Sequence, residues 1–259
     1  MTFYPGLEII PTTNPMGFEY GAGCFGPEVE KRTLDSIRKS LLDPNCTGPD
    51  PVYCIAMDVG KNIHKSLLFK YQLLFGVVTY AAGRLGNEPV RSQGHIHKRT
   101  RNNTMSPPEI YEIWTGKAII YMQESADDDP GRCFAVAAVP GEVVIVPPDW
   151  AHATISADPQ EPLTFGAWCD RNYGFEYDKV RAHRGLAWFP LLTGDGSLDW
   201  IPNKHYHSAE LIKKRPENYR SLGITQGTPI YSTFEEKPDA FLYITQPHIK
   251  KKVWDTFIP

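Results

Sequence analysis

The amino-acid sequence predicts an all-β sandwich or barrel, and two observations support this prediction. From about residue 45 to residue 190, short apolar or alternating runs follow one another with turn residues about every 8 to 12 positions and hardly any helical pattern between them. Proline is also frequent, at 23 of 259 residues, which disfavours long helices because proline cannot donate a backbone hydrogen bond. A loop-rich β architecture fits both observations.

The expected strands begin near residue 52 and follow the chain in order. An acidic loop at 126–131 and a Pro140-Gly141 turn separate the later ones. The apolar or alternating runs that define the strands are PVYCIAMDV, LLFGVVTYAAG, EIYEIWTGKAIIYMQ, RCFAVAAV, EVVIV, HATIS and LTFGAWC.

Three regions are expected along the chain. Residues 1–44 form an N-terminal arm and a short helix, because Leu34, Ile37 and Leu41 repeat at helical spacing within 27–43. Residues 45–207 form the barrel. Residues 208–259, with the short amphipathic piece SAELIKK, form a C-terminal extension that either packs on the barrel or serves as a dimer arm.

Charge and cysteine content exclude several classes of function. The chain has 27 basic and 30 acidic residues, so no bulk positive field would attract nucleic acid or an anionic membrane. No apolar run approaches the roughly 18 residues of a membrane helix, and the N-terminus lacks a signal-peptide pattern. Five cysteines without CxxC spacing indicate neither a disulfide framework nor a zinc ribbon. We expect a cytoplasmic protein that binds a small molecule.

One group of side chains has the composition of a metal site. His95 and His97 are two residues apart, so their imidazoles share one face of a strand. Glu109 opens the next strand, and His152 follows the apolar run EVVIV. Three imidazoles and one carboxylate suit Fe(II), Mn(II), Ni(II) or Zn(II), and we favour one Fe(II) per subunit. By strand alternation, Glu112 faces away from Glu109.

The spacing of these residues resembles the two motifs of the cupin superfamily. GHIH at 94–97 and the glutamate seven residues before Gly116 are similar to the first motif, and Gly141-x5-Pro147 with His152 to the second. The run PGEVVIVPPDWAHATIS at 140–156 resembles the second motif of one family in particular, the cupin-type phosphoglucose isomerases. The resemblance covers roughly residues 45–207 and implies a cupin barrel, that is, a jelly roll or double-stranded β-helix.

The resemblance also implies an activity and a set of site residues. The activity is metal-dependent interconversion of glucose 6-phosphate and fructose 6-phosphate, a step of glycolysis and gluconeogenesis, in a cytoplasmic homodimer. The metal ligands would be His95, His97, Glu109 and His152, and the catalytic residues Glu109, Tyr111 and His152. The implied substrate-binding residues are Tyr53, Thr79, Ser92, Gly94, Tyr111 and Tyr177.

Some positions depart from the family pattern. Phe175 stands where the family usually has a histidine, and Cys169 where a tyrosine is expected. The family threonine of the first phosphate-binding strand aligns with Val78 or, after a slip of one residue, with Thr79. A cupin isomerase or epimerase of another sugar or sugar phosphate, or a cupin dioxygenase, therefore remains an alternative. Proton transfer through an enediolate and a hydride shift both remain open.

A second histidine pair, His205 and His207, has no glutamate and glycine at cupin spacing behind it. We expect this pair to be at the surface or to serve packing.

Overall fold

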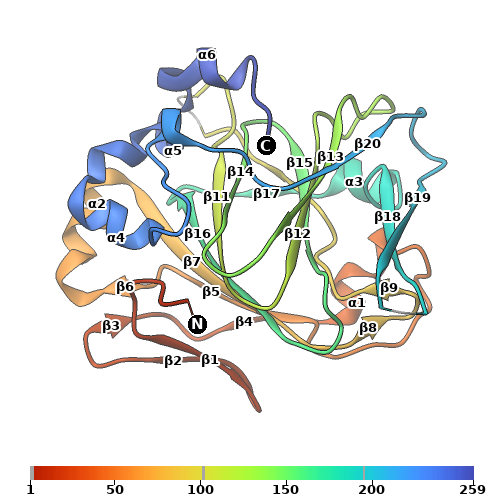
Figure 1. Ribbon diagram of the computed structural model, residues 1–259, viewed down its shortest axis with the longest axis horizontal. Helices are drawn as coiled ribbons and strands as arrows, with labels where there is room; N and C mark the ends of the chain where they lie inside the picture. Colours follow the sequence, from red (N-terminus) through yellow and green to blue (C-terminus); the bar gives the residue numbers. More distant parts are fainter. Residues whose placement is uncertain (1–2, 101–102, 195) are drawn as a thin grey trace.

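The computed structural model describes residues 3–100, 103–194 and 196–259, and its centre is a pair of β-sheets that face each other (Figure 1). The larger sheet has the strand order β14 (Val143–Val146), β11 (Glu109–Thr115), β16 (Leu163–Asp170), β7 (Leu73–Tyr80), β5 (Tyr53–Met57), β4 (Glu30–Arg32). The smaller sheet has the order β15 (Ala151–Ser156), β12 (Ala118–Gln123), β13 (Cys133–Ala138), β20 (Leu211–Lys214).

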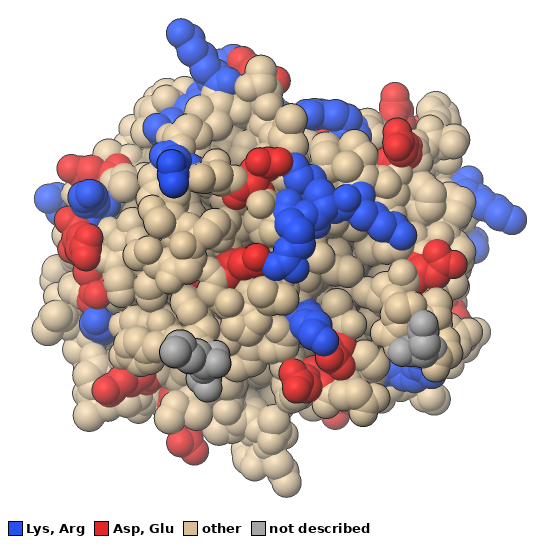
Figure 2. Space-filling view, viewed as in Figure 1, with Lys and Arg blue, Asp and Glu red and all other residues tan. Residues whose placement is uncertain are grey.

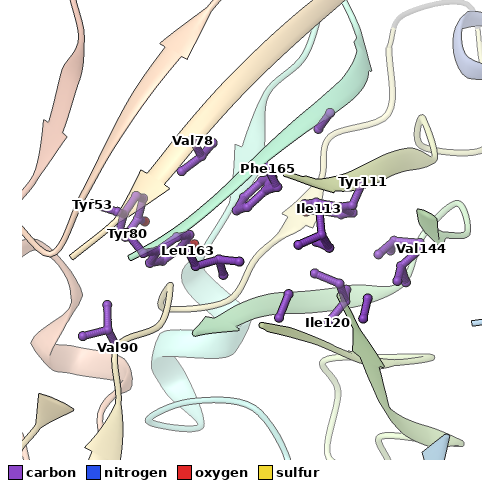
Figure 3. Close-up of a cluster of buried hydrophobic side chains, with 14 of the residues drawn as sticks. Tyr53, Val78, Tyr80, Val90, Tyr111, Ile113, Ile120, Val144, Leu163 and Phe165 are labelled. Atoms are coloured by element: carbon purple, nitrogen blue, oxygen red, sulfur yellow. The ribbon is translucent and has the colours of Figure 1, made fainter. Parts of the chain in front are cut away.

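The strands of both sheets pair antiparallel except β13 and β20, which are parallel. Since side chains alternate between the two faces of a strand, each sheet turns one set of residues inward. Figure 3 shows part of this interior, where Ile113 of the larger sheet lies near Ile120 of the smaller one. Two facing antiparallel sheets around one interior form the cupin barrel, so the predicted fold class is confirmed.

The outer face of the larger sheet is also buried. Every residue of β7 is buried, which explains why this strand reads as a continuous apolar run. The indole of Trp168 stacks on Tyr231 with ring centroids 5.5 Å apart. The covering helices come mainly from the C-terminal extension: η3 (Arg220–Leu222), α4 (Ile230–Glu236), η4 (Pro238–Phe241), α5 (Leu242–Thr245), η5 (Pro247–Lys250), α6 (Lys251–Trp254).

Short hairpins and helices surround the two sheets. A third apolar cluster covers the outside of the smaller sheet, where Tyr121 stacks on Trp200. The paired strands are β1 (Ile9–Thr13) with β2 (Met16–Tyr20), β3 (Cys24–Phe25) with β6 (Gly60–Lys61), β8 (Arg84–Leu85) with β9 (Glu88–Pro89), β10 (Ile96–His97) with β17 (Phe175–Glu176), and β18 (Trp188–Leu192) with β19 (Leu198–Pro202). The remaining helices are α1 (Leu34–Ile37), η1 (Arg38–Ser40), η2 (Asn62–His64), α2 (Lys65–Tyr71) and α3 (Asp178–Ala182).

The helix expected over 27–43 is wrong in its extent. Residues 30–32 instead form β4, which pairs with β5 at the edge of the larger sheet. The helix then begins after Thr33, whose side chain accepts a hydrogen bond from the backbone N–H of Ser36 at 3.3 Å, and only α1 and η1 follow. The apolar positions Leu34 and Ile37 are buried as expected.

The sequence assigned no secondary structure to the amphipathic piece SAELIKK, and its end forms strand β20 against β13. Helix α2, which lies between β6 and β7, was not expected from the sequence. In the described part of the chain, no helix is both long and apolar enough to cross a membrane. Figure 2 shows basic and acidic side chains interspersed on the face viewed.

Glu112 connects the barrel to the C-terminal extension. Its carboxylate accepts hydrogen bonds from the backbone N–H of Ile230 at 2.7 Å and from Trp114 Nε1 at 3.0 Å. Burial raises the pKa of Glu112 to about 8, although both hydrogen bonds oppose the rise. The unfolded carboxyl titrates near about 4.3, so between these two values the native state holds the proton more firmly than the unfolded state does.

We therefore expect the contribution of Glu112 to stability to be greatest below pH 4.5 and to fall as the pH rises to about 8. Glu112→Gln cannot ionise. Relative to wild type, its free energy of unfolding in urea should rise by on the order of a few kcal/mol between pH 5 and pH 8. The exposed Glu161→Gln is the control, and equal pH profiles for wild type and Glu112→Gln would refute the assignment.

Candidate metal centre

Backbone pairing brings three histidines together inside the barrel. His95 and His152 form an isolated antiparallel bridge, with reciprocal N–H to carbonyl hydrogen bonds of 3.0 and 2.9 Å. His97 lies in β10 and pairs with Phe175 of β17. The rings of His95 and His152 are 4.3 Å apart between centroids, and those of His95 and His97 are 5.2 Å apart.

Glu109 completes the group from the first position of β11. One ligand atom from each of His95, His97, Glu109 and His152 lies within 4.8 Å of all the others. Glu109 Oε2 is 3.1 Å from His97 Nε2 and 3.2 Å from His152 Nε2. Among the described residues this is the one such group of metal-binding side chains, so the four residues predicted as ligands do converge.

In His97 and His152, the hydrogen bond of Nδ1 determines that Nε2 faces the centre of the cluster. Nδ1 of His97 lies 3.1 Å from the carbonyl of Pro107, and Nδ1 of His152 lies 3.2 Å from that of Trp150. Because a carbonyl can only accept, each Nδ1 donates its proton, and each Nε2 is left with a lone pair directed inward.

The donor set fits a bound cation. The buried Nε2 atoms of His95 and His97 have no hydrogen-bond partner, although His97 Nε2 lies close to Glu109. Unpartnered buried nitrogens are costly, and coordination to a metal would satisfy both.

Electrostatics keeps the cluster in a form that can bind metal. Burial lowers the pKa of His95 well below its ordinary value, and His152 and His97 lower it further. Burial also lowers the pKa of His152. In Glu109 burial acts in the opposite direction, but the adjacent His97 and His152 outweigh it and hold the pKa of this carboxyl well below its usual range. Neutral imidazoles beside an ionised carboxylate are the states that coordinate metal.

Two further side chains hold the carboxylate of Glu109. The hydroxyl of Tyr111 donates to Oε2 at 2.6 Å, and the thiol of Cys169 donates to Oε1 at 3.2 Å. Burial and the nearby Glu109 raise the pKa of Tyr111 well above its usual value, so the hydroxyl keeps its proton. The sequence singled out Cys169 only as a departure from a family pattern, whereas here it supports the ligand directly.

A cavity of about 260 Å³ opens next to the donor cluster. Four of the predicted substrate-binding residues line it: Tyr53, Ser92, Tyr111 and Tyr177. One of its walls is a row of rings on four adjacent strands of the larger sheet, which we call the aromatic row and part of which is seen in Figure 3. The aromatic row consists of Tyr53, Tyr80, Phe165 and Tyr111, with successive centroids 4.7, 5.9 and 5.3 Å apart.

The two other predicted substrate-binding residues are not in the cavity lining. Thr79 is buried and its hydroxyl bonds that of Thr164 at 3.0 Å, while the neighbouring Val78 lines the cavity because alternate residues face opposite ways. Gly94 has φ +89°, and a Cβ there would lie 2.8 Å from Leu186 Cδ1. Its position therefore requires glycine for the turn into His95.

Several cavity residues had no assigned role in the sequence. Phe175, noted there only as a departure, packs against His95 with ring centroids 4.5 Å apart. Glu30 and Arg32 of β4 also line the cavity. They were missed because the segment was read as part of a helix. The histidines at 205 and 207 are exposed, as expected.

Comparison with known proteins relates the barrel to one family. A family model described as "Glucose-6-phosphate isomerase (GPI)" matches residues 44–209, a stretch that contains all four residues of the donor cluster. The matched segment starts after β4 and ends just before β20.

Individual relatives carry the same description. A glucose-6-phosphate isomerase of Thermococcus litoralis is 29% identical over 115 residues, which cover 44% of this chain and 55% of the relative. One from Pyrococcus horikoshii is 31% identical over 135 residues, 52% of this chain and 65% of the relative. A solved oxalate oxidase with glycolate overlaps 41% of this chain and 46% of its own, at 18% identity and a TM-score of 0.32. The chain thus spans less than two thirds of the length of either isomerase.

We expect the purified protein to bind one divalent ion per chain, measurable by elemental analysis after dialysis. His97→Gln removes one of the four ligands. We expect metal binding to weaken by at least about 10- to 100-fold, because loss of a residue that only hydrogen-bonds to a metal ligand already has an effect of this size. The control is His205→Gln at an exposed position. Equal metal content in the two variants would contradict the assignment of His97.

Proposed function

Because the chain belongs to the glucose-6-phosphate isomerase family, we propose that it interconverts glucose 6-phosphate and fructose 6-phosphate. The observation that carries the proposal is a donor cluster of three histidines and one glutamate that borders a cavity. Its volume of about 260 Å³ lies just below the about 300–1,000 Å³ of drug-sized ligand sites, which suits a single small metabolite.

His95, His97, Glu109 and His152 would hold the metal, for which we propose Fe(II). A bound divalent ion would act as a Lewis acid that polarises the carbonyl of the open-chain sugar. Three of the four side chains of the cluster are buried, and their low-dielectric surroundings strengthen the electrostatic interactions within it.

Glu109 is the proposed base. The reaction moves one hydrogen between C1 and C2, and an ionised carboxylate beside the cavity can take the proton from one carbon and return it to the other. The Tyr111 hydroxyl donates its one proton to Oε2 and holds this oxygen in place, and its own oxygen can accept a hydrogen bond from a hydroxyl of the substrate. His152 Nε2 lies 3.2 Å from the same oxygen, so both atoms could coordinate one metal ion.

The remaining parts of the proposal concern the substrate and the setting. Tyr53, Ser92 and Tyr177 line the cavity and would contact the sugar phosphate. We further propose that the protein acts in the cytoplasm as a homodimer, at the glycolytic and gluconeogenic step between the two hexose phosphates. An exposed strand edge is commonly covered by such pairing.

The primary test is conversion of fructose 6-phosphate to glucose 6-phosphate in a coupled assay. We expect the activity to disappear after treatment with EDTA and to return when one of Fe, Mn, Ni or Zn is added back. Protein that carries one ion per chain yet does not convert this substrate would refute the proposed substrate. The alternative is then another sugar phosphate, because Phe175 packs against His95 beside the same cavity.

Glu109→Gln tests the base. We expect turnover to fall by at least about 100-fold, within the range general base catalysis contributes, while part of the bound metal is retained. The matched control is Glu112→Gln, a buried carboxylate of the same strand that faces the C-terminal extension, and its turnover should stay within a few-fold. Turnover in D2O should introduce deuterium into the product. A complete absence of deuterium would favour a hydride shift, which needs no base.

A further inference from the structure

One cationic side chain enters the cavity from outside the segment that the family model matches. Arg32 lies in β4, at the edge of the larger sheet, whereas the match begins at residue 44. In the described lining of the cavity, Arg32 is the one arginine or lysine. Its side chain is 25% exposed, so it is partly withdrawn from water but can still be reached from the cavity.

The strand register explains why Arg32 points inward. Arg32 pairs directly with Tyr53 of β5, and Glu30 pairs with Ile55. Directly paired residues share a face of the sheet, and all four line the cavity. Lys31, between them, belongs to the opposite face and is exposed.

The surroundings of Arg32 suit an anion. Tyr53, its cross-strand partner, and Tyr177 line the same cavity as Arg32, and the guanidinium opposes the rise in pKa that burial causes in both tyrosines. Tyr177 lies in turn near the donor cluster, with its ring centroid 6.1 Å from that of His95. The partner of Arg32 in this structure is Glu30, whose side chain is 55% exposed and can turn toward solvent.

We propose that Arg32 binds the phosphoryl group of the substrate. The carboxylate of Glu30 forms an ion pair with the guanidinium of Arg32 until the substrate binds. The inference rests on the proposed function for the identity of the sugar. In an open-chain hexose 6-phosphate the reacting carbons C1 and C2 and the phosphate stand at opposite ends. A cation is therefore needed away from the metal ligands, and arginine offers two parallel N–H donors that match a phosphoryl group. Arg32 is then a specificity-determining residue that the N-terminal arm contributes.

The first experiment measures binding of inorganic phosphate without turnover, by isothermal titration calorimetry. We expect Arg32→Gln to weaken phosphate binding by 10-fold or more and Arg32→Lys to weaken it less. Lys31→Gln removes the same charge one residue away on the opposite face and should bind phosphate within twofold of wild type. Equal phosphate affinity in Arg32→Gln and Lys31→Gln would overturn the proposal.

The second variant leaves Arg32 in place, so it remains informative even where Arg32→Gln fails to fold. Glu30→Gln removes the competing carboxylate and should tighten phosphate binding by several-fold. Unchanged or weaker binding would contradict the exchange between Glu30 and phosphate.

Kinetics separates a binding role from a structural one. Arg32→Gln should raise KM for fructose 6-phosphate by at least 10-fold, change kcat less, and leave the metal content as in wild type. A loss of metal, or a fall in kcat at constant KM, would assign Arg32 to the support of the barrel instead. Should wild type bind phosphate through Arg32 yet not convert fructose 6-phosphate, the proposed function fails and the anion site stands.

Discussion

The cost of burying three imidazoles and a carboxylate inside an apolar barrel governs the arrangement of the candidate site. Each buried polar atom needs a partner, because a polar group that is removed from water and left unpaired costs free energy. The carbonyls of Pro107 and Trp150 accept from two rings, and Tyr111 and Cys169 donate to Glu109. The ligand atoms that remain are the inward-facing nitrogens of the histidines and an ionised oxygen of Glu109. A divalent cation would coordinate all of them together.

Strand alternation explains part of why the candidate ligands could be named from the sequence. Period-two alternation is a local rule, so His95 and His97 share a face wherever their strand lies, and Glu109 and Glu112 do not. The structure places one carboxylate inside the barrel and the other against Ile230 of the C-terminal extension. Two glutamates three residues apart thus have different tasks, one at the donor cluster and one in holding a helix to the sheet.

The features that could not be predicted depend on contacts between distant segments. Leu34, Ile37 and Leu41 do repeat at helical spacing and are buried. The residues before them, however, form the edge strand β4 against β5, and no local sequence pattern predicts this strand. For the same reason Arg32 could not be assigned to the cavity. The packing of 208–259 likewise depends on the outer face of the larger sheet, where Trp168 meets Tyr231. The sequence left open whether this extension packs or joins subunits.

In the proposed arrangement, the metal ligands and the arginine that binds the phosphoryl group come from different parts of the chain. The donor cluster and most of the cavity lining lie within the matched segment 44–209, whereas Glu30 and Arg32 arrive on a strand added to the sheet edge. The aromatic row ends at Tyr53, next to Arg32, and at Tyr111, next to Glu109. An edge strand contacts only one neighbour, so its residues can change with little effect on the geometry of β11 and β15. In the proposed arrangement, the anion-binding end of the cavity therefore lies on this edge strand, whereas Glu109 and His152 of the donor cluster lie on β11 and β15.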